Sequence, residues 1–211
     1  VEPVQGEGGM TPATPEFLEH CRKLCDQHDA LLIFDEVQSG VGRSGQLYAY
    51  QHYGVTPDIL SSAKALGCGF PMGAMLTRAE IAKVLTPGTH GTTSGGNPLA
   101  CAVGYAAVHE ISQPEFLAQV RSNTEFMHKE LEAIGERTGT FSEVRGLGLW
   151  FGCQLTAEHA GQAGAILGRA LDLGVMVLVA GADVIRLAPA LNTDRQTLAQ
   201  GLAKLEAALT M

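Results

Sequence analysis

The sequence predicts an α/β fold with a mainly parallel sheet, followed by a smaller α+β unit. Helix-spaced segments alternate with short apolar runs in the first half, and 211 residues suffice for one large domain or two small ones. Near residue 112 the pattern changes to a long amphipathic helix followed by short strands. We therefore expect two domains, over residues 1–112 and 113–211.

The first expected domain alternates between helix and strand patterns. Thr14 can cap a helix over residues 14–29, and Pro15 suits its first turn. The apolar run 31–34 (LLIF) is typical of a buried strand, and it leads directly into Asp35. The other elements expected here are strands at about 58–62 and 72–76, a short helix at 78–85 and a helix at 98–111.

The second expected domain begins with an amphipathic helix that starts near Ser112 (SQPEF) and runs to about residue 135. The sequence contains no internal repeat and no low-complexity segment. The elements expected after this helix are a strand at 143–155, a helix near 160–173, short strands at 175–180 and 184–189, and a final helix at about 194–209.

The composition excludes several classes of protein. Hydrophobic residues make up 45% and charged residues 17%, which is typical of a folded globular chain. The formal net charge of -8 disfavours nonspecific nucleic-acid binding, because no basic patch is available to neutralise phosphates. The apolar runs are too short to span a bilayer, and no signal-peptide pattern opens the chain. We expect a cytoplasmic protein with no nucleic-acid or membrane partner.

The five cysteines are scattered along the chain and odd in number. Cys21 and Cys25 lie one helical turn apart, but neither paired histidines nor a second close cysteine pair completes a metal site. We therefore expect reduced thiols and no metal.

Three polar features suggest chemistry. Asp35 ends a strand, where ligands bind in α/β sheets, although a capping or surface acid would look the same. Lys64 ends another expected strand among small residues; such a lysine is either solvated or forms a Schiff base with an aldehyde. The loop 90–98 (HGTTSGGNP) offers amides and hydroxyls to a phosphate, or is a plain turn. The other glycine-rich fragments lack the full dinucleotide fingerprint.

Together these features describe one cofactor, pyridoxal 5'-phosphate, which needs an acid for its ring nitrogen, a lysine for its aldehyde and a loop for its phosphate. The blocks that carry them are 31–45 (LLIFDEVQSGVGRSG), 57–74 (PDILSSAKALGCGFPMGA) and 88–103 (GTHGTTSGGNPLACAV). In order and spacing they resemble the class III (ornithine-type) aminotransferases of pyridoxal phosphate fold type I. Segments 2–9 (EPVQGEGG) and 184–191 (VIRLAPAL) match as well.

The resemblance implies a role for each matched residue at the cofactor. Asp35 corresponds to the acid that pairs with the protonated ring nitrogen, and Lys64 corresponds to the Schiff-base lysine. Val37 corresponds to the residue that packs on the ring face. Gln38 corresponds to the residue that contacts the ring hydroxyl.

The phosphate contact implied by the resemblance involves a second copy of the chain. Thr93, with Thr92 beside it, corresponds to the hydroxyl that a neighbouring subunit supplies to the phosphate. The resemblance thus implies a homodimer with shared active sites. Two positions depart from the family pattern: Ser94 stands where an aromatic residue is common, and Cys68 lies in a loop that is often all glycine.

The resemblance also implies a substrate site. Arg186 corresponds to the arginine that binds a substrate carboxylate, and Glu7 to an acid that pairs with this arginine. Glu7 would mask Arg186 while an ornithine-type donor is bound and would release it for 2-oxoglutarate or glutamate. Without the resemblance, Arg186 reads as a surface arginine at a strand end.

Within the family, the sequence is most similar to acetylornithine and succinylornithine aminotransferases, which implies transfer of the terminal amino group of N-acetylornithine or N-succinylornithine to 2-oxoglutarate in arginine metabolism. Another class III enzyme, such as an ω-amine transaminase, an aminomutase or a decarboxylase, would share the cofactor motifs. A third possibility is an inactive fragment that acts only in folding or dimerisation. Family members are longer, so we expect a C-terminal half that exposes a sheet edge and apolar surface.

Overall fold

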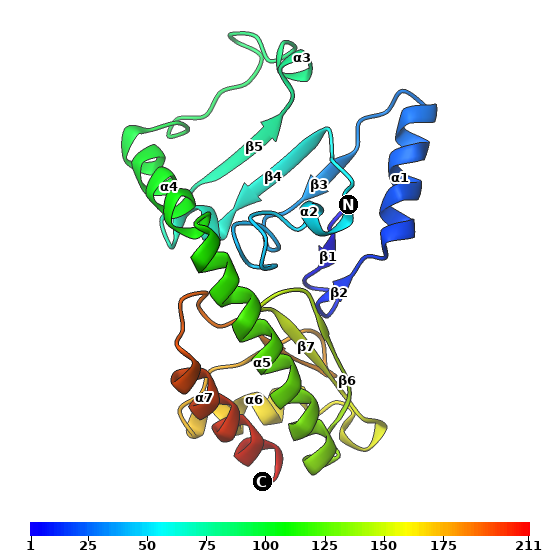
Figure 1. Cartoon of the computed structure of the whole chain (residues 1–211), viewed down its shortest axis with the longest axis vertical. Helices are drawn as coiled ribbons and strands as arrows, with labels where there is room; N and C mark the ends of the chain where they lie inside the picture. The colour runs from blue at the N-terminus through cyan, green and yellow to red at the C-terminus, as the bar shows by residue number, and fades with distance from the viewer. The chain divides into compact units, whose positions relative to one another are not determined.

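The computed structural model of the chain describes residues 1–211, which form two compact units (Figure 1). The segments of unit 1 are 1–3, 13–42 and 46–117, and those of unit 2 are 4–12, 43–45 and 118–211. Two short segments from the N-terminal part of the chain therefore belong to the unit that holds the C-terminus. Each unit has its own sheet and helices.

Unit 1 contains a three-stranded sheet in the order β3-β4-β5, with strands β3 (Ile33–Asp35), β4 (Ile59–Ala63) and β5 (Gly73–Thr77) (Figure 1). Strands β3 and β4 are parallel, whereas β5 runs antiparallel to β4. The expected strands are present. The two parallel strands are β3, which ends at Asp35, and β4, which directly precedes Lys64.

The helical segments of unit 1 are α1 (Pro15–Gln27), α2 (Tyr50–Tyr53), the 3-10 helix η1 (Lys64–Gly67), α3 (Ala79–Ala82) and α4 (Pro98–Ile111). Thr14 caps α1 as predicted, because its Oγ1 accepts the N–H of Phe17 at 3.2 Å. Asn97 caps α4 in the same way, with its Oδ1 accepting the N–H of Ala100 at 2.9 Å. Both long helices predicted for this part are confirmed.

The apolar run that leads into Asp35 is buried on one face only. Leu32 and Phe34 are buried and pack against Leu18 of α1. Leu31 and Ile33 are 49% and 47% exposed, because successive side chains of a strand point to opposite faces of the sheet. The run is therefore buried on one face, and its other face exposes apolar side chains, as expected for this chain.

Unit 2 contains a four-stranded antiparallel sheet and a separate two-stranded hairpin. The strands of the larger sheet, in spatial order, are β6 (Phe141–Gly146), β7 (Phe151–Leu155), β9 (Val184–Leu187) and β8 (Leu178–Val179). The hairpin pairs β1 (Val4–Gln5) with β2 (Thr11–Pro12), and β2 packs near β6.

The region 143–155, expected as one strand, consists of two antiparallel strands, β6 and β7, joined by a turn. Gly146 and Gly148 have positive φ angles of 146° and 70°, which reverse the chain. A Cβ at Gly148 would lie 2.2 Å from the carbonyl oxygen of Arg43, so the turn also requires a residue without a side chain. The single-strand prediction is wrong because these glycines mark a turn.

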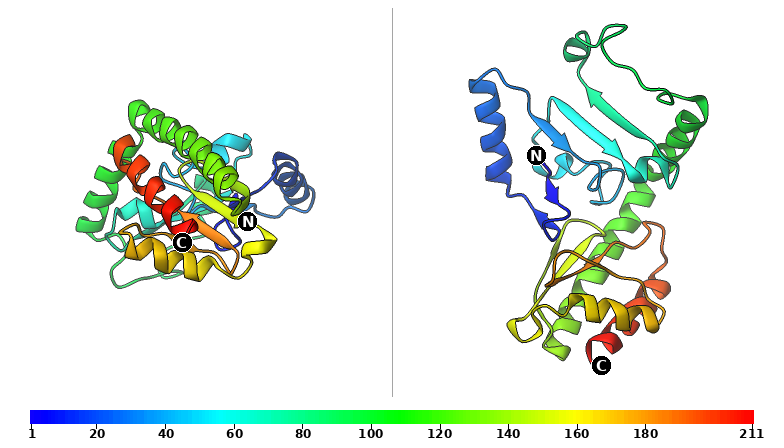
Figure 2. Two further views of the ribbon diagram at one scale, coloured as in Figure 1. Left: turned by 90° about the horizontal axis from the view of Figure 1, so that it is seen from below. Right: turned by 180° about the vertical axis from the view of Figure 1, so that it is seen from behind.

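Three α-helices and one short 3-10 helix complete unit 2: α5 (Pro114–Thr138), whose first residues belong to unit 1, η2 (Ala157–His159), α6 (Ala163–Asp172) and α7 (Arg195–Leu209). Helices α6 and α7 lie side by side in both views of Figure 2 and contact each other. His128 of α5 lies against Phe151 of β7, with ring centroids 6.2 Å apart. None of the helices is both long and apolar enough to span a membrane.

Candidate active site

Asp35 and Lys64 lie at one edge of the sheet of unit 1. Asp35 is the last residue of β3 and pairs in register with Ser61 of β4. Lys64 directly follows Ala63, the last residue of β4. Because β3 and β4 are parallel, their carboxyl ends meet at the same edge, where α/β sheets bind ligands. The structure thus brings together the two residues predicted to hold the reactive end and the ring nitrogen of a cofactor.

Asp35 has one carboxylate oxygen committed and one open. Its Oδ1 accepts the hydroxyl of Ser61 at 3.1 Å and the N–H of Val37 at 3.0 Å. Neither bond uses Oδ2, and the side chain is exposed. The two bonds hold the carboxylate in a fixed orientation, so Oδ2 can accept a proton donor brought by a ligand.

Lys64 has an unusual backbone conformation. Its φ angle is +50°, in the left-handed region that non-glycine residues rarely adopt. Such a conformation costs on the order of 1–3 kcal/mol and is concentrated at functional sites. The η1 helix that starts at Lys64 packs against α4, where a Cβ at Gly104 would lie 3.7 Å from the carbonyl oxygen of Leu66. The lysine side chain itself is exposed.

Val37 and Gln38 lie in the turn that follows β3, and both are half-buried. The strand ends at Asp35, so strand alternation does not place Val37 and Asp35 on a common face. Their proximity instead comes from the turn, in which the Val37 N–H bonds to the Asp35 carboxylate. The predicted contacts of Val37 and Gln38 with a cofactor ring stay predictions.

Glu36, the acid that directly follows Asp35 in the sequence, has a structural role. It is fully buried and accepts hydrogen bonds from the N–H groups of Ala49 and Tyr50 and from the hydroxyl of Ser39. Burial raises its pKa, and these three hydrogen bonds partly oppose that shift. Glu36 therefore anchors the start of α2 while the neighbouring acid faces outward.

Thr92 and Thr93 lie in the loop that precedes α4, and both are exposed. The structure shows no hydrogen bond between either hydroxyl and Asp35 or Lys64. The resemblance assigns these hydroxyls to a neighbouring subunit, and that assignment stays a prediction.

Unit 2 holds the predicted pair of Glu7 and Arg186. Nη1 of Arg186 donates to Oε1 of Glu7 at 3.0 Å. The Arg186 side chain is 15% exposed, and its guanidinium lies 5.4 Å from the ring centroid of Trp150. Glu7 is 80% exposed. A largely buried arginine is thus covered by an acid that water reaches freely.

Arg43 is a further cation in unit 2 that the sequence reasoning missed. Its Nη1 donates to the carbonyl oxygens of Leu149 and Pro189, both at 2.8 Å. Burial, and to a smaller extent the positive charge of Arg186, lowers the pKa of Arg43 to about 10. Two arginines close enough to interact make this part of the unit attractive to anions. The single tryptophan of the sequence was a signal that could have marked this region.

The residues at the sheet edge fit pyridoxal phosphate. Oδ2 of Asp35 can accept the N–H of a protonated pyridine ring, and the exposed primary amine of Lys64 can react with an aldehyde. No group of three or more His, Cys, Asp or Glu side chains in the structure is arranged to hold a metal ion.

Comparison with known proteins places this arrangement in a family. The family model described as Aminotransferase class-III matches residues 1–209. The acetylornithine aminotransferase of Neisseria meningitidis is 57% identical over 210 residues, covering 100% of this chain and 53% of the relative. The succinylornithine transaminase of Salmonella enteritidis is 60% identical over 202 residues, covering 96% and 50%.

Solved structures agree. The N-acetylornithine aminotransferase of Stenotrophomonas maltophilia superposes with a TM-score of 0.90 at 46% identity, over 98% of this chain and 54% of that one. An ornithine aminotransferase of Toxoplasma gondii, described with partial occupancy of pyridoxal phosphate at its active site, superposes with a TM-score of 0.92 at 31% identity, over 100% and 50%.

The chain belongs to the class III aminotransferases, a family of pyridoxal phosphate-dependent enzymes of fold type I. It is most usefully compared with their acetylornithine and succinylornithine members, of whose length it spans about half.

Proposed function

We propose that the protein containing this chain is an aminotransferase that moves the terminal amino group of N-acetylornithine or N-succinylornithine to 2-oxoglutarate, in arginine metabolism. The observation that carries the proposal is the placement of Asp35 and Lys64 at the ends of neighbouring parallel strands. Relatives named for these substrates share more than half of the residues of the chain.

Pyridoxal phosphate, when bound, supplies an electron sink for the negative charge left on the substrate carbon that loses a proton. Asp35 would keep the ring nitrogen protonated through Oδ2. Val37 would cover the ring face, and Gln38 would contact the ring hydroxyl. These three residues follow one another along β3 and its turn, so a single rigid segment orients the ring.

Lys64 would hold the aldehyde carbon of the cofactor through Nζ until the amino group of the substrate replaces it. The freed Nζ would then be the group that takes a proton from the substrate carbon as a base and gives it back as an acid.

Glu7 and Arg186 would let one site accept two kinds of substrate. Arg186 would bind the α-carboxylate of 2-oxoglutarate or glutamate, and Glu7 would cover it while the acylated ornithine is bound. The 3.0 Å contact between Arg186 and Glu7 supports this proposal, because Glu7 is 80% exposed and can return to water when a substrate carboxylate takes its place.

We further propose a cytoplasmic homodimer in which Thr92 and Thr93 of one subunit contact the cofactor phosphate of the other. The two proposed domains are residues 1–112, the later part of the cofactor domain, and residues 113–211, a small C-terminal domain. The exposed position of both threonines supports the shared site.

Reductive labelling tests the cofactor site. The chain is incubated with pyridoxal phosphate, reduced with borohydride and analysed by intact mass and peptide mapping. We expect one pyridoxyl adduct, on Lys64, that Lys64→Arg abolishes and that Lys83→Arg, a change at another exposed lysine of unit 1, leaves intact. An adduct spread over several lysines, or retained in Lys64→Arg, would contradict the proposed role.

Substrate preference is tested separately, with the protein containing this chain. Glutamate formed from 2-oxoglutarate is measured with N-acetylornithine, N-succinylornithine and an ω-amine that lacks an α-carboxylate. We expect an acylated ornithine to give the highest kcat/KM. A higher value for the simple amine would favour an ω-amine transaminase.

A further inference from the structure

The loop that carries Glu7 lies over a row of three residues on neighbouring strands of unit 2. In the register of the sheet, Arg145 of β6 is opposite Gly152 of β7, and Gly152 is opposite Arg186 of β9. Side chains directly opposite each other in antiparallel strands project from the same face. Two arginines therefore flank a position without a side chain.

The carbonyl group of Gly9 fills the space above Gly152. A Cβ at Gly152 would lie 2.5 Å from the Gly9 oxygen, so any side chain there would displace the loop. Nε of Arg145 donates to the same oxygen at 2.8 Å. A Cβ at Gly9, whose φ angle is +97°, would in turn lie 2.7 Å from Nη2 of Arg145.

Arg145 is itself held in place by its neighbours. Its Nη1 donates to Oε2 of Glu143 at 2.7 Å and its Nη2 donates to Oε1 of Gln154 at 3.2 Å. The fully buried Met10, which follows Gly9, has its Cε 3.0 Å from where a Cβ at Gly152 would lie. Met10 also packs in a cluster with Trp150, the ring over which Arg186 lies. The turn is thus held on the C-terminal side of Glu7 by Gly9 and Met10, while the side chain of Glu7 remains exposed.

We propose that Arg145 and Gly152 are positioning residues that hold the Glu7 loop so that Glu7 covers Arg186. Arg145 fastens the Gly9 carbonyl, and Gly152 leaves the space in which it sits. Neither residue touches a substrate. The proposal rests on the proposed role of Glu7 and Arg186, and it adds the part of the fold that sets how readily the pair opens.

A binding experiment on the chain tests the proposal without catalysis. Glutarate, a dicarboxylate without an amino or keto group, is titrated while the fluorescence of Trp150, the single tryptophan, is recorded. Glu7→Gln removes the competing acid, and we expect it to lower the Kd for glutarate about 2- to 5-fold, the range of an exposed ion pair. Gly152→Ala and Arg145→Gln should also lower the Kd for glutarate, because each would release the loop that carries Glu7.

The sign of the Arg145→Gln effect separates positioning from charge. The loss of a positive charge by itself would weaken glutarate binding and raise the Kd. Release of the loop would unmask Arg186 and lower the Kd. Arg145→Lys, which keeps the charge and can still donate to Gly9, should restore most of the wild-type value. The control Arg137→Gln, which breaks an ion pair with Glu206 elsewhere in unit 2, should leave the Kd unchanged.

Combination with Glu7→Gln decides the outcome. If Arg145 acts through Glu7, the double variant Glu7→Gln/Arg145→Gln should bind glutarate no more tightly than Glu7→Gln alone. One result would overturn the positioning role. Glu7→Gln would lower the Kd for glutarate, but Arg145→Gln and a folded Gly152→Ala would leave it unchanged or raise it. A Kd that Glu7→Gln itself does not lower would instead overturn the proposed masking of Arg186. Circular dichroism of each variant identifies any that fails to fold. If Gly152→Ala fails to fold, Arg145→Gln still tests the proposal.

Discussion

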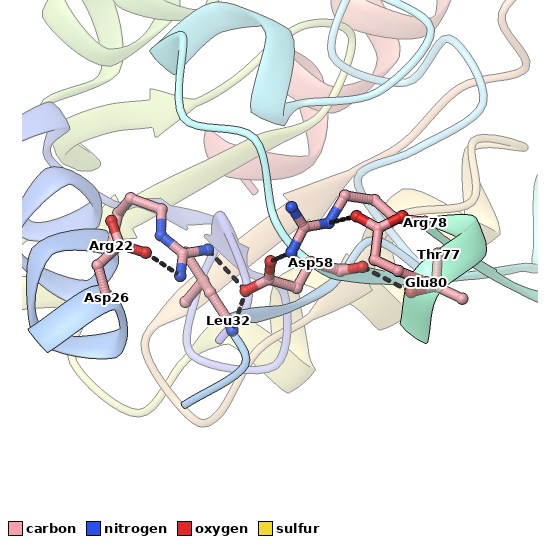
Figure 3. Close-up of polar contacts among 7 residues, drawn as sticks. All are labelled: Arg22, Asp26, Leu32, Asp58, Thr77, Arg78 and Glu80. Carbon is pink, nitrogen blue, oxygen red and sulfur yellow. Dashed lines mark hydrogen bonds and ion pairs between the residues drawn. The ribbon is translucent and has the colours of Figure 1, made fainter. Parts of the chain in front are cut away.

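Two acids of this chain, Asp58 in unit 1 and Glu7 in unit 2, pair with arginines in opposite ways. Asp58 is 7% exposed and lies between Arg22 and Arg78, with Oδ2 2.7 Å from Arg22 and Oδ1 2.6 Å from Arg78 (Figure 3). Its Oδ2 also accepts the N–H of Leu32 at 2.8 Å. Glu7 is 80% exposed and has one arginine partner in a 3.0 Å contact.

The difference shows how burial sets what an ion pair can do. A buried acid with several donors cannot lose one partner without leaving a desolvated charge, so the Asp58 network joins α1, the start of β4 and the approach to α3 permanently. Glu7 is solvated whether its partner is present or absent, so the cost of separating the pair falls on the 15% exposed Arg186, which a bound carboxylate would compensate. The first arrangement suits structure, and the second suits a reversible cover.

The largest change in the free energy of unfolding should come from a substitution of Asp58. Replacement Asp58→Asn removes the charge that compensates both arginines, and we expect the free energy of unfolding to fall by about 3 kcal/mol. Urea denaturation followed by circular dichroism measures it. The matched control is Asp26→Asn, which removes a 64% exposed acid that pairs with the same Arg22 at 2.6 Å and should change stability little. Equal effects of the two variants would break the comparison.

The pH dependence of stability should show the same network. Burial alone would raise the pKa of Asp58, but hydrogen bonds from Arg22 and Leu32 and the charges of both arginines outweigh it, so the pKa is lowered. A lowered folded pKa gives a contribution that is present above the pKa of about 3.9 of an unfolded aspartate and is lost as the pH falls through the folded value. Denaturation from pH 7 to pH 3 should therefore show Asp58→Asn converging on the wild type at the acid end.

The two arginines around Asp58 should differ in how much each contributes to the free energy of unfolding. Arg22 is 22% exposed and Arg78 is 57% exposed. We expect Arg22→Met to cost about 2 kcal/mol, because it leaves a buried acceptor short of a donor, and Arg78→Met less than about 1 kcal/mol. The same denaturation experiment compares them. A larger loss for Arg78→Met would mean that exposure is a poor guide to the strength of these contacts.

The smallest stability effect should come from Glu7. Replacement Glu7→Gln should change the free energy of unfolding by less than about 0.5 kcal/mol, because the acid is exposed and has one partner. In the protein containing this chain it should nevertheless alter the ratio of kcat/KM values for the two half-reactions. Stopped-flow measurement of each half-reaction tests this, and equal changes in both would contradict a role in choosing between substrates.

Local patterns in the sequence predicted most elements of the fold. The long helices were found because capping residues such as Thr14 and a 3.6-residue apolar spacing act within a few residues. Asp35 and Lys64 were recognised as site candidates because both follow apolar strand patterns, and the family resemblance added their roles. Periodicity predicts a single strand where β6 and β7 form two, because the turn between them depends on backbone angles of glycines that periodicity does not reveal.

The sequence by itself thus determined the helices, the strands of unit 1 and the residue types of a pyridoxal phosphate site. Only the tertiary structure decided that residues 4–12 join unit 2, that Arg145, Gly152 and Arg186 form one row, and that Asp58 is enclosed by two arginines. The physical reason is that capping and strand patterns are short-range properties. Strand register and the burial of a charge depend instead on residues far apart in the chain, whose contacts exist only once the sheet has formed.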